Sequence, residues 1–252
     1  MSRLGTGRLL DAGCGLGFET ARLAGEGREL VGVDWDVAAA SAAARAHRGA
    51  GLLASCSDAG RLGFRDGTFD YVCSSHIVEH FDTPARHVSE VARVLDAGGT
   101  AFFLTPNAPW DFENPFHVVL FRRDELASLL REHFEEVLVT GLDASARVKR
   151  DFAERRGKAT RLLSRVDPWD VRHRVPRSWL VAFYSRALPL VYRLVSSDDS
   201  GGGTGITEED YFVSDEIDDS TPVLFAIASR PIRPRSRGCA PPSVAPGAPG
   251  AR

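Results

Sequence analysis

Four side chains of the kinds that bind metal ions or move protons stand out in the sequence. His76, Glu79 and His80 have the spacing i, i+3 and i+4, which places side chains on one side of a helical turn. His117 lies in a loop expected after the next strand, at the same edge of the predicted sheet. Three imidazoles and a carboxylate can hold a divalent cation, so these four residues form a candidate metal site.

The same residues are open to two other interpretations. His76 or His117 could act as a metal-free general base, which takes a proton from a reacting hydroxyl group. Alternatively, the Glu-His pair could serve only the geometry of a helical turn, with His117 a hydrogen-bonded residue of its loop. The sequence leaves all three interpretations open.

A glycine-rich stretch near the N-terminus is expected to organise the elements that position these side chains. A short apolar run from Leu9 predicts a buried strand, and glycines then alternate at positions 13, 15 and 17 before a helix can begin. Such a turn brings backbone N–H groups and the positive end of a helix close to a ligand.

The spacing of these glycines disfavours a dinucleotide. The dinucleotide pattern is Gly-x-Gly-x-x-Gly, but Phe18 stands where the third glycine should be. Asp11, just before the turn, would repel a pyrophosphate and suits a ligand that carries an ammonium group. A nicotinamide-dependent oxidoreductase is therefore disfavoured.

Alternating strands and helices follow this stretch. Glu29–Asp34 predicts a second strand, and a carboxylate at its end can accept hydrogen bonds from both hydroxyls of a ribose. Trp35, next in the chain, can pack on an adenine. The further elements expected are a helix at 37–48, a strand at 52–55, a turn leading into a strand within 66–74, strands at 100–104, 137–139 and 223–228, and helices at 84–95 and 122–131. This order predicts an α/β fold, a Rossmann-like, doubly wound, seven-stranded and mostly parallel sheet.

Four segments together resemble the class I S-adenosylmethionine (SAM) methyltransferases, in particular small-molecule enzymes of methyltransferase type 11 and of ubiquinone biosynthesis. They are the glycine-rich stretch with Asp11, the strand that ends at Asp34, the segment around Asp58, and Asp66-Gly67-Thr68-Phe69-Asp70-Tyr71-Val72. The resemblance implies an enzyme that uses SAM, with Asp58 bonded to the adenine amino group. The SAM-binding residues that it implies are Asp11, Gly13, Gly15, Gly17, Asp34, Trp35, Asp58 and Ser75.

The histidine cluster is similar to that of two metal-assisted groups, the ubiquinone-biosynthesis O-methyltransferases and the small-RNA 2′-O-methyltransferases. The latter have Glu-x-x-Glu-His after this strand and a later histidine. Here His76 replaces the first glutamate. This departure disfavours Mg²⁺ and favours a softer ion such as Zn²⁺, Co²⁺ or Mn²⁺.

The sequence predicts four parts: a SAM-binding core at 1–142, a helical insertion or lid at 143–222, a last core strand at 223–230 and a disordered tail at 231–252. The insertion has 13 Lys/Arg against 4 Asp/Glu between 147 and 193, then 9 Asp/Glu and no Lys/Arg between 196 and 222. The basic part is either a helical subdomain with a solvated face or a lid that recognises an anionic substrate. Since few residues precede the first strand, another segment is expected to cover the cofactor, unless the start codon is misplaced.

Length, composition and net charge restrict the class of protein and its partners further. The chain has 252 residues, a net charge of −3 and 43% hydrophobic residues, which is typical of a globular protein and makes nucleic acid an unlikely partner. Scattered cysteines and the lack of a signal peptide or a membrane-spanning run predict a cytoplasmic protein. We expect O-methylation of a small molecule, a sugar or natural-product hydroxyl. The alternatives are RNA 2′-O-methylation and a catalytically silent SAM-binding protein.

Overall fold

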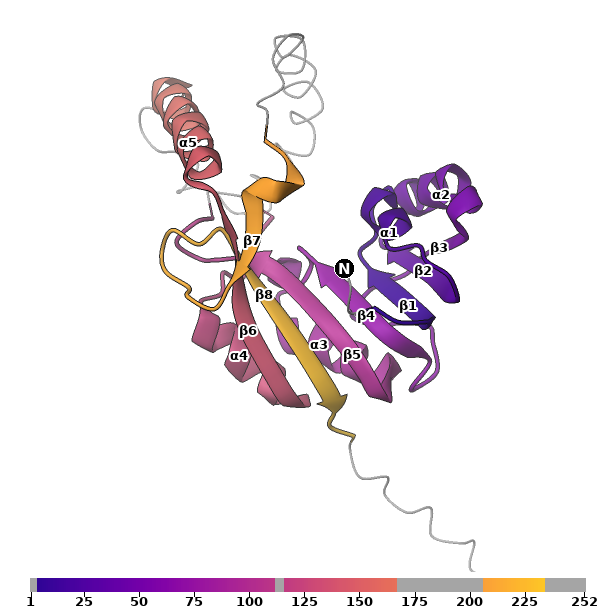
Figure 1. Ribbon diagram of the computed structural model, residues 1–252. Helices are drawn as coiled ribbons and strands as arrows, with labels where there is room; N and C mark the ends of the chain where they lie inside the picture. The colour runs from indigo at the N-terminus through magenta and orange to yellow at the C-terminus, as the bar shows by residue number, and fades with distance from the viewer. Residues whose placement is uncertain (1–3, 112–115, 167–205, 234–252) are drawn as a thin grey trace, which may run out of the picture.

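The computed structural model describes residues 4–111, 116–166 and 206–233, with side chains omitted for 158–166 (Figure 1). One sheet of eight strands runs through it in the order β3-β2-β1-β4-β5-β8-β6-β7. The strands are β1 (Gly7–Ala12), β2 (Arg28–Asp34), β3 (Leu52–Cys56), β4 (Phe69–Ser75), β5 (Leu95–Pro106), β6 (Phe134–Ala144), β7 (Tyr211–Ser214) and β8 (Val223–Pro231).

The sheet is mostly parallel, as the sequence predicts. β1, β2, β3, β4 and β5 pair in parallel, while β8 is antiparallel to both β5 and β6. Consecutive side chains of β1 point to opposite faces, each covered by helices. Leu9 packs with Ala43 on one face, and Leu10 belongs to the larger core with Val88 on the other. The predicted doubly wound fold is therefore confirmed.

The predicted number of seven strands is wrong by one. β7 adds an eighth strand, pairing antiparallel with residues 141–144 of β6. β6 can accept this partner because it continues to Ala144, beyond the predicted end at Val139. The short β7, Tyr-Phe-Val-Ser, was hidden by the acidic residues on both sides of it.

The helices cover the sheet where their apolar faces allow. They are α1 (Phe18–Arg22), α2 (Val37–Ala46), α3 (Pro84–Val94), α4 (Arg123–Arg131) and α5 (Ala146–Val166). α3 begins with a proline, which suits the first turn of a helix, and buries Val88 and Val91. Figure 1 shows α3 and α4 behind the sheet and α5 extending away from the end of β6. The described residues also form the short 3₁₀ turns η1 (Arg48–Ala50), η2 (Val78–His80) and η4 (Glu208–Asp210).

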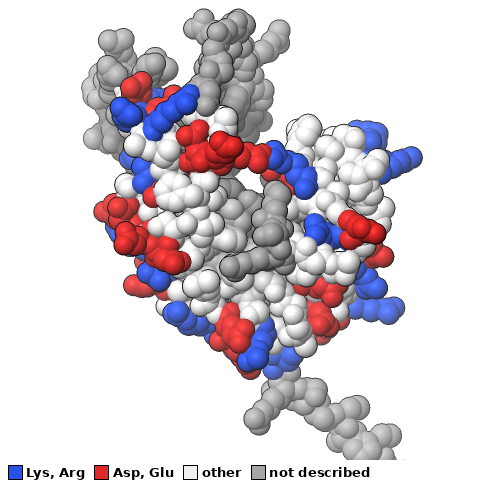
Figure 2. Space-filling view, viewed as in Figure 1, with Lys and Arg blue, Asp and Glu red and all other residues white. Residues whose placement is uncertain are grey.

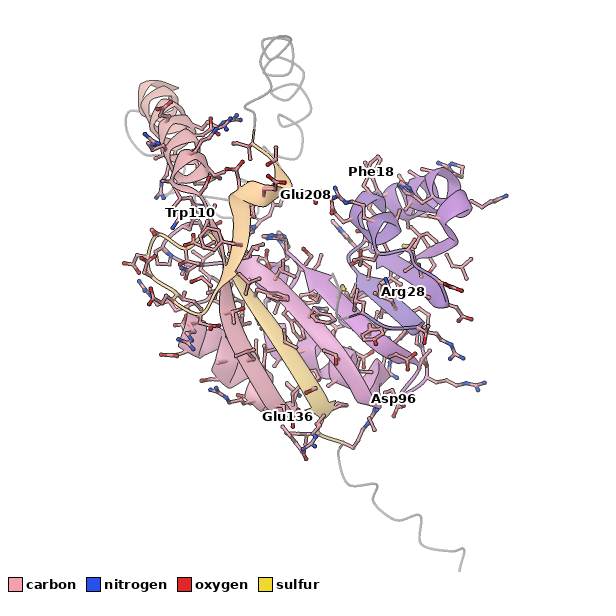
Figure 3. The ribbon with its side chains drawn as sticks, in the orientation of Figure 1. Phe18, Arg28, Asp96, Trp110, Glu136 and Glu208 are labelled. Atoms are coloured by element: carbon pink, nitrogen blue, oxygen red, sulfur yellow. The ribbon has the colours of Figure 1, made fainter. Side chains whose placement is uncertain are left out.

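The described parts of the insertion contact the core at two places. Phe152 of α5 stacks on Trp110 with ring centroids 4.8 Å apart, and Trp110 lies near the base of that helix in Figure 3. Glu208 of η4 forms an ion pair with Arg22 of α1. α5 matches the helix predicted at about 146–165. The second predicted helix, at 177–195, lies outside the described residues.

The predicted division into parts stays a prediction, although some boundaries fall inside elements. β6 crosses the boundary at 142/143, and β8 continues to Pro231. Arg233 donates hydrogen bonds to the carbonyl oxygens of Arg93 and Leu95, and the rest of the predicted tail lies outside the described residues. Cys14, Cys56 and Cys73 are free thiols. In the described part of the chain, no helix has both the length and the apolar character needed to cross a membrane.

Candidate active site

A cavity of about 720 Å³ opens at the carboxyl ends of β1, β2 and β4. This is the edge where doubly wound folds bind their ligands. The lining residues are Gly13, Val33, Asp34, Trp35, Ser57, Asp58, Ala59, Ile77, His80, Phe81 and Phe116. The cavity thus joins four of the predicted cofactor residues to one predicted metal ligand. A smaller polar hollow at the amino ends of the strands contains none of the predicted site residues.

The glycine turn has the backbone that its sequence predicts. Gly13, Gly15 and Gly17 all have positive φ angles, of 97°, 52° and 79°. Gly17 begins α1, and a Cβ there would lie 2.8 Å from Leu52 Cδ2, so this glycine serves packing. Gly15, by contrast, faces open space, and its N–H donates to Asp34 Oδ2 at 2.9 Å.

Replacing Gly13 with alanine is expected to damage both the fold and the cavity. A Cβ at this position would overlap Ile77 Cδ1, and the φ angle is one that side chains disfavour. We expect the variant to lose about 1–3 kcal/mol of unfolding free energy, measured by urea denaturation. Gly15→Ala, which meets no neighbouring atom, is the matched control and should lose less; equal losses would contradict this account.

Asp34 is held by backbone donors at the end of β2. Its Oδ2 accepts from Gly15 N, and its Oδ1 accepts from Asp36 N at 2.9 Å. A carboxylate has about four acceptor positions, so two remain for a ligand in the cavity. Trp35 beside it is highly exposed at the cavity wall. The geometry suits the predicted contact with a ribose.

Asp11 differs from the other predicted cofactor residues because it is buried behind the cavity wall. Its Oδ2 accepts a hydrogen bond from the Thr20 hydroxyl. Burial raises the pKa of this carboxyl to about 6, against the lowering effect of Thr20. Asp11, Gly15, Gly17 and Ser75 do not line the cavity, and Ser75 is exposed at the end of β4.

The raised pKa of Asp11 predicts a pH-dependent cost to stability. The protonated carboxyl stabilises the fold below about pH 4, and that contribution is lost as the pH rises through about 6. A difference of about two pK units corresponds to about 3 kcal/mol. In urea denaturation, the stability of Asp11→Asn relative to wild type should therefore rise by about this amount between pH 4 and pH 8. A pH-independent difference would contradict the assignment.

Glu79, His80 and His117 come together beside the cavity, and His80 lines it. One ligand atom from each lies within 4.8 Å of the other two. His80 Nδ1 donates to the carbonyl oxygen of Phe116 at 2.9 Å, and His117 Nδ1 donates to Asp111 Oδ1 at 2.8 Å. In neutral rings, Nε2 of both histidines therefore carries the lone pair that a metal ion needs.

Glu79 is the buried carboxylate of this cluster. The side chain is fully buried, and its Oε2 accepts from the Thr105 hydroxyl at 3.0 Å. Oε1 has no hydrogen-bond partner among the described residues, and His117 Nε2 lies 4.0 Å from it. Burial raises the pKa of Glu79, but the contacts with His76 and His80 lower it by more. The pKa of Glu79 therefore lies below its ordinary value. A buried carboxylate that stays ionised needs a cation, which fits a metal ion at this cluster.

His76 lies at the margin of this cluster. Its Nδ1 is 3.4 Å from Glu79 Oε1, but it is not one of the three residues that converge most closely. The side chain is half exposed, and the backbone has a φ of 55°, which is uncommon for a residue other than glycine. Strained backbone of this kind is often found at functional sites.

Sequence reasoning missed the residues that hold the cluster in place. Asp111 orients His117, and Thr105 orients Glu79. Both follow the fifth predicted strand, but such partners are set by the path of the loop. The i to i+6 spacing of Asp111 and His117 was the available signal.

Comparison with known proteins agrees with this geometry. Residues 10–103 match the family model described as a methyltransferase domain. Over these residues the chain is therefore similar to methyltransferase domains. A probable S-adenosylmethionine-dependent methyltransferase of Mycobacterium tuberculosis is 34% identical over 157 residues, covering 59% of this chain and 56% of that protein. The chain thus spans about half the length of the curated relatives it matches.

Two further methyltransferases are similar to this chain, one in sequence and one in structure. A ubiquinone biosynthesis O-methyltransferase of Methylococcus capsulatus is 32% identical over 103 residues, covering 40% of this chain and 44% of that protein. A solved SAM-dependent methyltransferase of Thermotoga maritima superposes with a TM-score of 0.55 at 15% identity, covering 91% of this chain and 84% of the other. The structural likeness confirms the fold of the methyltransferase domain.

Proposed function

We propose that this protein is a SAM-dependent O-methyltransferase that acts on a small molecule and deprotonates its acceptor hydroxyl with the help of a divalent cation. The observation that carries the proposal is the shared cavity. Asp34 and Asp58 line the same cavity as His80 of the metal-binding cluster. A cofactor held by the two carboxylates can therefore present a methyl group to an acceptor held beside His80.

The cofactor fits Asp34, Asp11 and the glycine turn. Asp34 has acceptor positions for the ribose hydroxyls, and the open side of Gly15 lets a ligand approach the backbone. Asp11 places a buried carboxyl close behind the turn, where the ammonium group of SAM would favour its ionised form. The relative from Mycobacterium tuberculosis, by its name, uses the same cofactor.

Beside the cofactor, the protein must orient an acceptor and remove its proton. Glu79, His80 and His117 would hold the cation, with Asp111 and the Phe116 carbonyl oxygen fixing the two imidazoles. When bound, a divalent cation lowers the pKa of a hydroxyl group beside it. His76, partly exposed beside Glu79, is placed to carry the released proton towards solvent.

A sugar or natural-product hydroxyl is the acceptor class that we propose. The ubiquinone biosynthesis relative is by its name an O-methyltransferase, and the Trp110–Phe152 pair adds aromatic surface to the loop that carries Asp111. Among the described residues of the face in view, Figure 2 shows acidic and basic side chains interspersed. An anionic acceptor would depend on the basic residues between 167 and 193, outside the described structure.

Methyl transfer from isotopically labelled SAM to a panel of sugar and phenolic acceptors tests the proposal. The protein should be assayed as purified, after treatment with a chelator, and after addition of Zn²⁺, Co²⁺, Mn²⁺ or Mg²⁺. We expect transfer that the chelator removes and that one of the ions restores. Transfer that persists without metal would contradict the cation, and transfer only to RNA would contradict the acceptor class.

A further inference from the structure

Two consecutive residues of α3 hold three consecutive residues of the loop after β3, which we call the 58–60 loop. Arg86 donates from Nη2 to Asp58 Oδ2 at 2.8 Å and from Nε to the Gly60 carbonyl oxygen at 3.0 Å. His87 donates from Nδ1 to the Ala59 carbonyl oxygen at 3.0 Å. Since Asp58 and Ala59 line the cavity, α3 determines the position of this part of its wall.

His87 is built into the core as a neutral ring. It is fully buried, and burial lowers its pKa. Because Nδ1 donates to a carbonyl oxygen, Nε2 accepts from the Ser74 hydroxyl at 2.8 Å. The ring also stacks on Phe81, with centroids 4.9 Å apart and planes within 8°. His87 therefore supports both the 58–60 loop and an aromatic side chain of the cavity.

The carboxylate of Asp58 has little freedom to turn. Oδ1 accepts from Gly60 N at 2.7 Å, while Oδ2 is held by Arg86. A Cβ on Gly60 would lie 2.9 Å from Phe81 Cε1 and 3.1 Å from Arg86 Nε, so the loop is confined on two sides. Two of about four acceptor positions on the carboxylate are used, and the others are available to a ligand in the cavity.

We infer that Arg86 and His87 are positioning residues that make the cavity selective for a 6-aminopurine over a 6-oxopurine. An exocyclic amino group donates to a fixed carboxylate, whereas a 6-oxo group would place an oxygen against it and leave a charged acceptor unpaired. The selectivity depends on Asp58 being unable to turn away, which is the effect of the contacts from α3. This inference rests on the proposed use of SAM and adds the residues that hold Asp58, the side chain that would contact its base.

Calorimetric titration with S-adenosylhomocysteine and its deaminated analogue S-inosylhomocysteine tests the inference on the full chain. We expect wild type to bind the adenosyl compound at least about tenfold more tightly, since the contact is to a charged group. Arg86→Ala should reduce that ratio at least about threefold, with Arg86→Lys intermediate. Arg61→Ala, which removes an exposed guanidinium from the same region, is the matched control and should keep the wild-type ratio.

The ratio of the two affinities separates positioning from a general structural role. Equal weakening of both ligands in Arg86→Ala, or an unchanged ratio, would overturn the inference. Because Arg86 is half exposed, this variant is expected to fold, and its melting temperature is measured alongside. His87→Gln gives a second test and should also reduce the ratio. If wild type binds neither compound, the proposed function itself fails, and this inference with it.

Discussion

Replacing Asp34 with alanine is expected to weaken the binding of SAM and S-adenosylhomocysteine by at least about 100-fold. Two hydrogen bonds from ribose hydroxyls to a charged acceptor are lost, each of about 1.5–3 kcal/mol. The variant also leaves the N–H groups of Gly15 and Asp36 without their acceptor, which loosens the turn that faces the ligand. Calorimetric titration measures the affinity directly.

The control for this variant is Glu29→Ala on the same strand. Glu29 is highly exposed and pairs with Arg8 at the surface, so its removal should change neither stability nor affinity appreciably. Asp34→Asn, which keeps one acceptor oxygen, should fall between alanine and wild type. An affinity of Asp34→Ala within threefold of wild type would show that the cofactor does not lie against β2.

Replacing His117 with alanine is expected to lower turnover by about 10²–10⁴-fold while leaving SAM affinity nearly unchanged. The variant removes one of three converging metal ligands but no group that lines the end of the cavity near Asp34. Binding of Co²⁺, followed by its visible absorption, should weaken in parallel. His133→Gln, between α4 and β6, is the matched control and should retain both properties.

Asp111→Asn distinguishes the orientation of the His117 ring from its role as a metal ligand. The substitution keeps the side chain's shape but removes the charge that fixes the His117 ring at 2.8 Å. We expect metal affinity to fall by about 10–100-fold, the usual effect of losing such a partner. Lost turnover in His117→Ala with unchanged Co²⁺ affinity would instead make His117 a metal-free base, and unchanged turnover would contradict both roles.

The parts of this structure that can be predicted from the sequence follow from the geometry of parallel strands. Carboxyl ends of neighbouring strands meet at one edge, so the sequence alone predicts that Asp34, the residues after β4 and His117 share a site. The structure places Asp34 and His80 in one cavity and brings His117 to Glu79. The glycine turn was predictable because positive φ angles restrict the choice of residue.

The parts that escaped prediction depend on contacts between distant segments. Nothing in the sequence near Arg86 or His87 indicates that they hold residues 58–60, because a helix face does not reveal which loop it meets. β7 was missed because four residues among acidic neighbours give no clear alternation. The burial of Asp11 likewise comes from the packing around Thr20.

The most direct test of the central claim is calorimetric titration of the full chain with S-adenosylhomocysteine, with NAD titrated into the same preparation. The account predicts one adenosyl compound bound per chain, with a Kd between about 1 μM and 1 mM, and no heat from NAD. A folded protein that binds NAD but not S-adenosylhomocysteine would contradict the assignment of the cavity to SAM.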